Sequence, residues 1–208
     1  MTVGYQVQAN QEQLKAAIQL FEFIGGNSTD AIRVAINRSG PKIRTKSSAA
    51  IRKQVRLKAG YVNERLKFDR ATNRKLDGRI STPSRGMLLS RFSTDTMVAN
   101  DSIRWMSPPP VPARGIRVKV KPSGTAKVVQ GDSDTEGKPF YMVLSQSRAL
   151  GIVARRKGSR KVKVFHGPSM SQVFNDVRDD VLPEASEVYT EELADAMRYL
   201  LSKRKPRE

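Results

Sequence analysis

Apolar residues recur at helical spacing near both ends of this 208-residue chain. In the first third they predict helices over residues 11–24, 31–40 and 41–58, with a short helix over 61–68. The boundary between the second and third of these is expected at Gly40-Pro41, because glycine commonly ends a helix and proline commonly opens one. The helix over 41–58 carries many Lys and Arg residues around a narrow apolar stripe.

The last forty residues return to the helical pattern. Ser169 or Ser171 can cap a helix that runs to Leu182 and buries Val173, Phe174 and Val177 on one face. Pro183 is expected to open a separate last helix, because proline is well tolerated in the first turn.

Between these ends the pattern changes from helical spacing to alternation. Short runs of alternating or continuous apolar residues predict strands at 117–121, 127–129, 140–144, 150–156 and 161–165. The proline-rich stretch 107–112 is expected to be an extended spacer, since proline cannot occupy a central strand.

Together these elements predict an α+β fold with a mostly antiparallel sheet in the middle and C-terminal half and helices at both termini. We expect an N-terminal helical region that includes the basic helix at 1–72. A β-rich region that contains the spacer 107–112 follows at 73–170. C-terminal helices at 171–208 are expected to pack on the sheet.

The net charge of the chain is strongly positive. Lys and Arg number 38 against 20 Asp and Glu, a net charge of +18. Residues 31–170 hold 31 of these bases and only 8 of the acids. Such clustering indicates a partner that is a polyanion or an acidic protein surface. Neither a membrane-spanning run nor a secretory signal is visible, so we expect a soluble protein that is made inside the cell.

Two basic clusters are the candidate contacts for that partner. One lies on the basic helix, and the other is a hairpin in which Gly158-Ser159 permits a tight exposed turn. No module for reading base sequence is recognisable, so contact with nucleic acid is expected to be through its backbone. The candidate residues are Arg44, Lys46, Arg52, Lys53, Arg56, Lys58, Arg155, Arg156, Lys157, Arg160, Lys161 and Lys163.

The sequence offers little for catalysis or for metal binding. The chain has no cysteine and a single histidine, His166, with no nucleophile motif beside it. Residues 132–137 resemble the opening of a calcium-binding loop, but Val143 stands where the essential Glu is required. We therefore expect no catalytic residues, no metal and no cofactor. A nuclease could use only the carboxylate cluster Asp176, Asp179 and Asp180.

Several short segments are similar to those of one known family. They are Ala35-Ile36-Asn37-Arg38, Lys138-Pro139-Phe140-Tyr141, the basic strand 151–156, the stretch from Val162 through a turn at Gly167-Pro168-Ser169 to Met170, Val173-Phe174, and a closing helix around Leu193. Their order resembles that of the phage minor tail protein Z family, the tail-completion proteins of long-tailed phages and prophages.

The resemblance implies a non-enzymatic virion protein at the head-proximal end of the tail, which supports head–tail joining. The implied partners are the tail tube, the tail terminator ring and other head–tail connector proteins, in a six-fold assembly that contains several copies of this chain. Unspecific contact with packaged double-stranded DNA is also implied, without a membrane. The alternative left open by the residues is a sequence-unspecific nucleic-acid-binding protein associated with ribosomes or the nucleoid.

Overall fold

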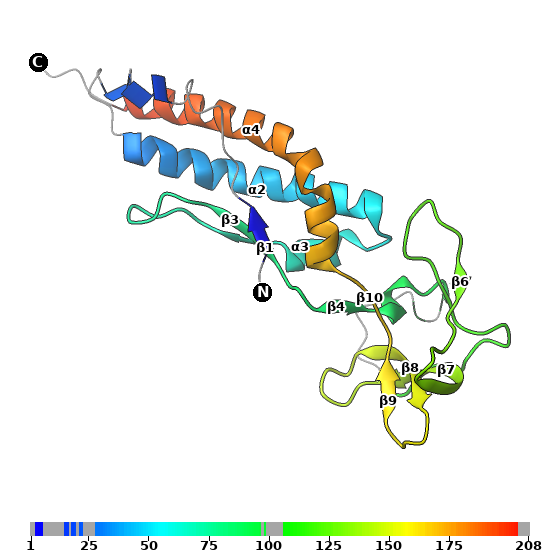
Figure 1. The fold of residues 1–208 in the computed structure, drawn as a ribbon. Coiled ribbons are helices and arrows are strands. Elements are labelled where there is room, and N and C mark those ends of the chain that lie inside the picture. The colour runs from blue at the N-terminus through cyan, green and yellow to red at the C-terminus, as the bar shows by residue number, and fades with distance from the viewer. Residues whose placement is uncertain are drawn as a thin grey trace, which may run out of the picture. The chain divides into compact units, whose positions relative to one another are not determined.

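The computed structural model describes residues 3–5, 15–16, 18–19, 21–22, 28–96, 98 and 106–203. These residues form an α+β protein that is divided into two compact units (Figure 1). The first unit comprises residues 1–51, 59–84 and 171–208, and the second comprises 52–58 and 85–170. The predicted α+β class is confirmed. The division into the successive segments 1–72, 73–170 and 171–208 stays a prediction, since compact units report packing and not independent folding.

The first unit is built around two long helices. Its elements are β1 (Val3–Tyr5), α2 (Ser28–Gln54, whose last three residues belong to the second unit), α3 (Ala59–Arg65), β2 (Lys67–Asp69), β3 (Arg79–Thr82) and α4 (Met170–Ser202, whose first residue belongs to the second unit). Figure 1 shows α2 and α4 running alongside each other. Of the predicted helix over 11–24, residues 15–16, 18–19 and 21–22 are helical, and its other positions lie outside the described residues.

A cluster of small and apolar residues joins the two long helices. Ala31 and Ala35 on α2 and Leu193 and Ala196 on α4 are buried together with Phe21. The two helices therefore pack through this side-chain cluster. No helix among the described residues carries an apolar stretch long enough to cross a membrane.

The two expected breaks at proline do not occur, and those predictions are wrong. Pro41 lies inside α2, which ends at Gln54, and Pro183 lies inside α4. An interior proline removes one helix hydrogen bond and costs about 3 kcal/mol. Each helix nevertheless buries residues on both sides of its proline: Ala31, Ala35, Ile43 and Ile51 on α2, and Val177, Val181, Ala185 and Leu193 on α4. Burial along a continuous face outweighs the lost bond.

Three short strands complete the first unit as the sheet β1-β3-β2. All pairs are antiparallel, with Phe68 of β2 opposite Ile80 of β3 and Tyr5 of β1 also opposite Ile80. The sequence analysis missed these strands, because runs of three or four residues are too short to show an alternating pattern. The short helix expected over 61–68 is present as α3, and its last residues belong to β2.

The second unit contains the other strands in three antiparallel sheets. Its elements are β4 (Gly86–Leu88), a 3-10 helix (Leu89–Phe92), β5 (Arg117–Val118), β6 (Lys127–Val128), β7 (Thr135–Val143), β8 (Leu150–Arg156), β9 (Val162–Val164) and β10 (His166–Ser169). The sheets are β7-β8-β9, β10-β4 and β5-β6. All five predicted strands are present, and residues 107–112 belong to no strand, as expected of the spacer.

The turn expected at Gly167-Pro168-Ser169 is instead part of β10, which pairs with β4 through an irregular register between His166 and Ser169. Proline is accepted here because the irregular register leaves its position outside a regular ladder. The centre of the unit is β8, in which residues 150–154 are buried one after another. A strand buried on both faces shows this continuous pattern and not alternation.

Candidate binding surfaces

The six candidate residues of the basic helix are divided between the two compact units. Arg44 and Lys46 are half-buried on the part of α2 that belongs to the first unit. The other four, Arg52, Lys53, Arg56 and Lys58, are exposed and belong to the second unit. Lys46 Nζ lies 2.8 Å from Glu184 Oε2 on α4, so its charge is partly compensated within the chain.

The acidic residues of α4 account for that compensation. Lys42 Nζ lies 2.5 Å from Oε1 of Glu192, whose side chain is almost fully buried. The hydrogen bond with Glu192 raises the pKa of Lys42 above its ordinary value. In the first unit, therefore, part of the positive charge of α2 is paired with carboxylates of α4.

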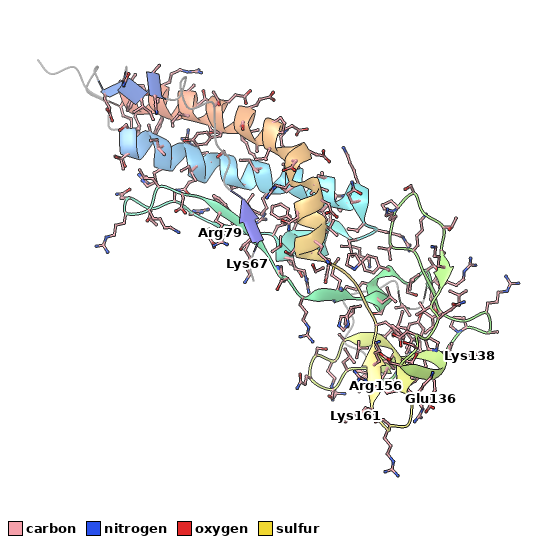
Figure 2. The ribbon with its side chains drawn as sticks, in the orientation of Figure 1. Lys67, Arg79, Glu136, Lys138, Arg156 and Lys161 are labelled. Carbon is pink, nitrogen blue, oxygen red and sulfur yellow. The ribbon has the colours of Figure 1, made fainter. Side chains whose placement is uncertain are left out.

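The hairpin between β8 and β9 presents its bases differently. Residues 155–161 are all exposed, and Arg156 N donates to Lys161 O at 2.9 Å, which closes the turn. Gly158 has φ of +63°, a left-handed conformation that glycine adopts without strain. Lys161 N also donates to Ser159 Oγ at 3.1 Å. Figure 2 shows Arg156 and Lys161 on this hairpin, with Glu136 on the neighbouring β7.

One hairpin residue, Lys163, is engaged inside the chain. Its Nζ lies 2.5 Å from Asp132 Oδ2 and 3.4 Å from Asp134 Oδ2. The hydrogen bond between them lowers the pKa of Asp132 and raises the pKa of Lys163. Glu136 lies opposite Arg155 in the β7–β8 ladder. Negative charge is therefore found at the base of the hairpin.

The bases further along the hairpin have no such compensation. Among the described residues, no carboxylate forms an ion pair with Arg156, Lys157, Arg160 or Lys161. Four positive charges within six residues are thus presented to solvent by one closed turn. Of the predicted contact residues, these and Arg155 are the ones that the structure brings together.

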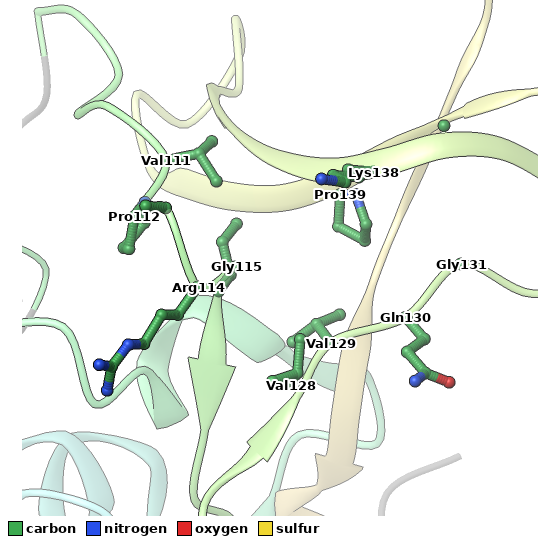
Figure 3. Close-up of a pocket in the computed structure, with 13 residues that line it drawn as sticks. Val111, Pro112, Arg114, Gly115, Val128, Val129, Gln130, Gly131, Lys138 and Pro139 are labelled. Atoms are coloured by element: carbon green, nitrogen blue, oxygen red, sulfur yellow. The ribbon is translucent and has the colours of Figure 1, made fainter.

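An apolar groove in the second unit is a feature that the sequence analysis did not find. It has a volume of about 490 Å³ and is lined by residues 111–116, 128–131 and 137–139. Figure 3 shows Val111, Val128 and Pro139 around this space. Val111 and Val128 are 40% and 46% exposed. No local pattern could have indicated it, because its lining comes from three segments that are separated in sequence.

The structure places the residues that the sequence offered for chemistry: His166 and the carboxylates of α4. No group of three or more His, Asp or Glu side chains among them is placed to hold a metal ion. His166 is exposed at the start of β10, and its Nδ1 lies 3.1 Å from the carbonyl oxygen of Val164 at the end of β9. The carboxylates of Asp176, Asp179 and Asp180 are exposed on α4, and Asp179 Oδ1 lies 3.1 Å from Arg178 Nε.

The described residues thus form a small α+β protein with an exposed basic hairpin, an apolar groove and a pair of long helices. The family model of prophage minor tail protein Z (GPZ) matches residues 12–205, and the chain belongs to this family. The resemblance expected from the sequence is confirmed. No curated protein and no solved structure matches the chain. The protein is accordingly a minor structural protein of a phage tail.

Proposed function

We propose that this minor tail protein completes the head-proximal end of the tail and supports the joining of the tail to the head, without catalysing a reaction. The observation that carries the proposal is membership of the minor tail protein Z family over residues 12–205. The contact surfaces are consistent with it, since a structural protein of an assembly acts through its contacts with neighbours.

The partners we propose are the tail tube, the tail terminator ring and other head–tail connector proteins. Several copies of the chain would join a six-fold assembly, in which each copy meets equivalent surfaces. The net charge of +18 favours partners of opposite charge. The groove beside Val111 and Val128 adds exposed apolar surface of the kind that marks contact sites.

The test is removal of the gene from the phage or prophage that encodes the protein, followed by electron microscopy of the lysate. We expect DNA-filled heads and tails of normal length that remain separate. Joining of heads to tails should be restored when the protein is supplied in trans. Infectious particles at the normal titre without the protein would overturn the proposal. Absence of tails altogether would also overturn it, because the protein would then act earlier in tail assembly.

The alternative function is that of a sequence-unspecific nucleic-acid-binding protein associated with ribosomes or the nucleoid. The exposed bases of the β8–β9 hairpin are the observation that favours it. Sedimentation of disrupted, nuclease-treated virions separates the two functions. A tail-completion protein remains with DNA-free tails, whereas a nucleoid or ribosome factor is absent from them.

A further inference from the structure

We propose that the tip of the β8–β9 hairpin, residues 155–161, binds the phosphate backbone of double-stranded DNA without reading its sequence. This inference rests on the proposed function for the source of the DNA, which is the packaged genome at the head–tail junction. The binding itself is a property of the purified protein and is tested separately from the role in the tail.

Positive charge along the hairpin is only partly matched by carboxylates. Asp132 and Asp134 form ion pairs with Lys163, and Glu136 lies opposite Arg155. Lys157 N donates a hydrogen bond to the backbone oxygen of Asp134 at 3.1 Å. Among the described residues, Arg156, Lys157, Arg160 and Lys161 have no carboxylate partner. Unscreened like charges held at one tip repel one another, and an external polyanion relieves that repulsion.

The tip of the hairpin is a closed turn that follows a buried stretch of β8. Residues 150–154 of β8 are buried, and Ile152, Val153 and Ala154 have no exposed surface. The bond from Arg156 N to Lys161 O and the left-handed Gly158 close the turn directly above them. A preformed turn loses little backbone entropy on binding, so its charges act together.

The chemistry of the tip distinguishes DNA from an acidic protein surface. Residues 155–161 are Arg, Arg, Lys, Gly, Ser, Arg and Lys, with no apolar or aromatic side chain. Protein interfaces depend on apolar and aromatic anchors at their centre and are depleted in Lys. Contacts with phosphate oxygens need only Arg and Lys donors. The tip also carries no Asn or Gln with which to recognise base edges.

The basic helix is the weaker candidate for the same role. Its bases are divided between the two units, and Lys46 is paired with Glu184 on α4. Arg56 Nη1 also lies 3.4 Å from the carbonyl oxygen of Ser93, which draws its guanidinium toward the chain.

The experiment measures binding of the full-length protein to a duplex of about 30 base pairs of mixed sequence over a series of salt concentrations. The test variant combines Arg155→Ser, Arg156→Ser, Arg160→Ser and Lys161→Ser. Each neutralised phosphate contributes about 0.9 to the log–log slope, so the slope should flatten by roughly 3–4 units. Affinities for duplexes of unrelated sequence should differ little.

A matched control removes the same charge from exposed positions elsewhere: Lys67→Ser, Arg70→Ser, Arg74→Ser and Arg85→Ser. Its slope should change by less than about 1 unit. An unchanged slope in the hairpin variant, or equal flattening in both variants, overturns the inference. If the hairpin variant fails to fold, Arg160→Ser alone should flatten the slope by about 1 unit, and Arg160→Lys should not; an unchanged slope with Arg160→Ser overturns the inference.

The inference and the proposed function fail in different ways. A hairpin variant that keeps the normal salt slope but is not incorporated into tails would assign the tip to an acidic protein surface and overturn DNA binding. Normal head–tail joining after removal of the gene would overturn the proposed function and leave the measured DNA binding in place.

Discussion

Gly40 shows how a single residue can be misread when only its neighbours in sequence are considered. A Cβ atom at this position would lie 2.0 Å from Cζ of Phe68, so only glycine leaves room for the ring. Gly78 also lies near this ring, since a Cβ at that position would lie 3.0 Å from Phe68 Cε2. Gly40 therefore serves the packing of β2 against α2 and does not end the helix.

Gly40→Ala should consequently destabilise the protein, although alanine is the better helix former. The added methyl group forces the half-buried Phe68 ring to move, and such overpacking costs about 1–3 kcal/mol. Chemical denaturation measures the free energy of unfolding. The control is Gly60→Ala in α3, where no atom lies within 4 Å of the new Cβ; it should be neutral or stabilise by up to about 1 kcal/mol. Equal effects of the two substitutions would contradict this account.

The pKa of Lys163 likewise depends on residues that are distant in sequence. Its hydrogen bond with Asp132 lowers the pKa of that carboxyl below 3.8 and raises the pKa of Lys163 above 10.5. The lowered carboxyl pKa contributes stability that is present above pH 3.8 and is lost as the pH falls through the folded value. The raised lysine pKa contributes stability that is lost as the pH rises through its own folded value.

An NMR titration of the Asp132 carboxyl tests this pair directly. Its midpoint should lie below 3.8 in the unmodified protein and move back up in Lys163→Met, because the main cause of the shift has been removed. Lys161→Met is the matched control, since Lys161 forms no ion pair with the described acids, and it should leave the midpoint nearly unchanged. If neither substitution changes the midpoint, the Asp132–Lys163 pair does not form in solution.

At the scale of elements, the seam between α2 and α4 organises the first unit. Its centre is the cluster of Phe21, Ala31, Ala35, Leu193 and Ala196. At its surface, Lys42–Glu192 and Lys46–Glu184 link the same helices. The Lys46–Glu184 pair is exposed on both sides and contributes little to stability, whereas the apolar cluster is buried between the helices.

Leu193→Ala should therefore destabilise the protein by about 2–5 kcal/mol, because it removes buried apolar surface and leaves a cavity between the helices. Thermal and urea unfolding followed by circular dichroism measure the loss. The adjacent exposed substitution Ala194→Ser should change stability by no more than about 0.5 kcal/mol. A small loss with Leu193→Ala would mean that the two helices are held together chiefly by their ion pairs.

At the scale of the whole molecule, the dominant property is the excess of positive charge. Residues 31–170 hold 31 bases and 8 acids, a net charge of +23. Repulsion among the bases opposes the compact state unless counterions or a partner screen it. At about 0.15 M ionic strength the Debye length is about 8 Å, which is short enough to weaken this repulsion.

The unfolding temperature should therefore rise by roughly 2–4 °C between about 20 mM and about 200 mM NaCl, which corresponds to about 1 kcal/mol. The rise should be smaller in the hairpin variant with four fewer charges, because less repulsion remains to be screened. Differential scanning calorimetry of both proteins measures it. A fall in unfolding temperature with salt would show that the internal ion pairs outweigh the repulsion.

The sequence by itself determined the features that depend on neighbouring residues. Apolar spacing indicated the helical segments that make up α2, α3 and α4 and the strands β5 to β9, because burial of a helix or strand face requires that spacing. The exposed basic turn was equally local: Gly158-Ser159 and five bases occur within seven residues. The α+β class and the family membership followed from the order of these segments.

The tertiary structure decided what depends on residues far apart in the chain. It made Pro41 and Pro183 interior residues, because burial on both sides of each proline outweighs the lost hydrogen bond. It paired β10 with β4, assembled the groove from three segments, and neutralised Lys46 with Glu184 and Lys163 with Asp132. The two ion pairs join residues 31 and 138 positions apart, and no local pattern reports on such distances.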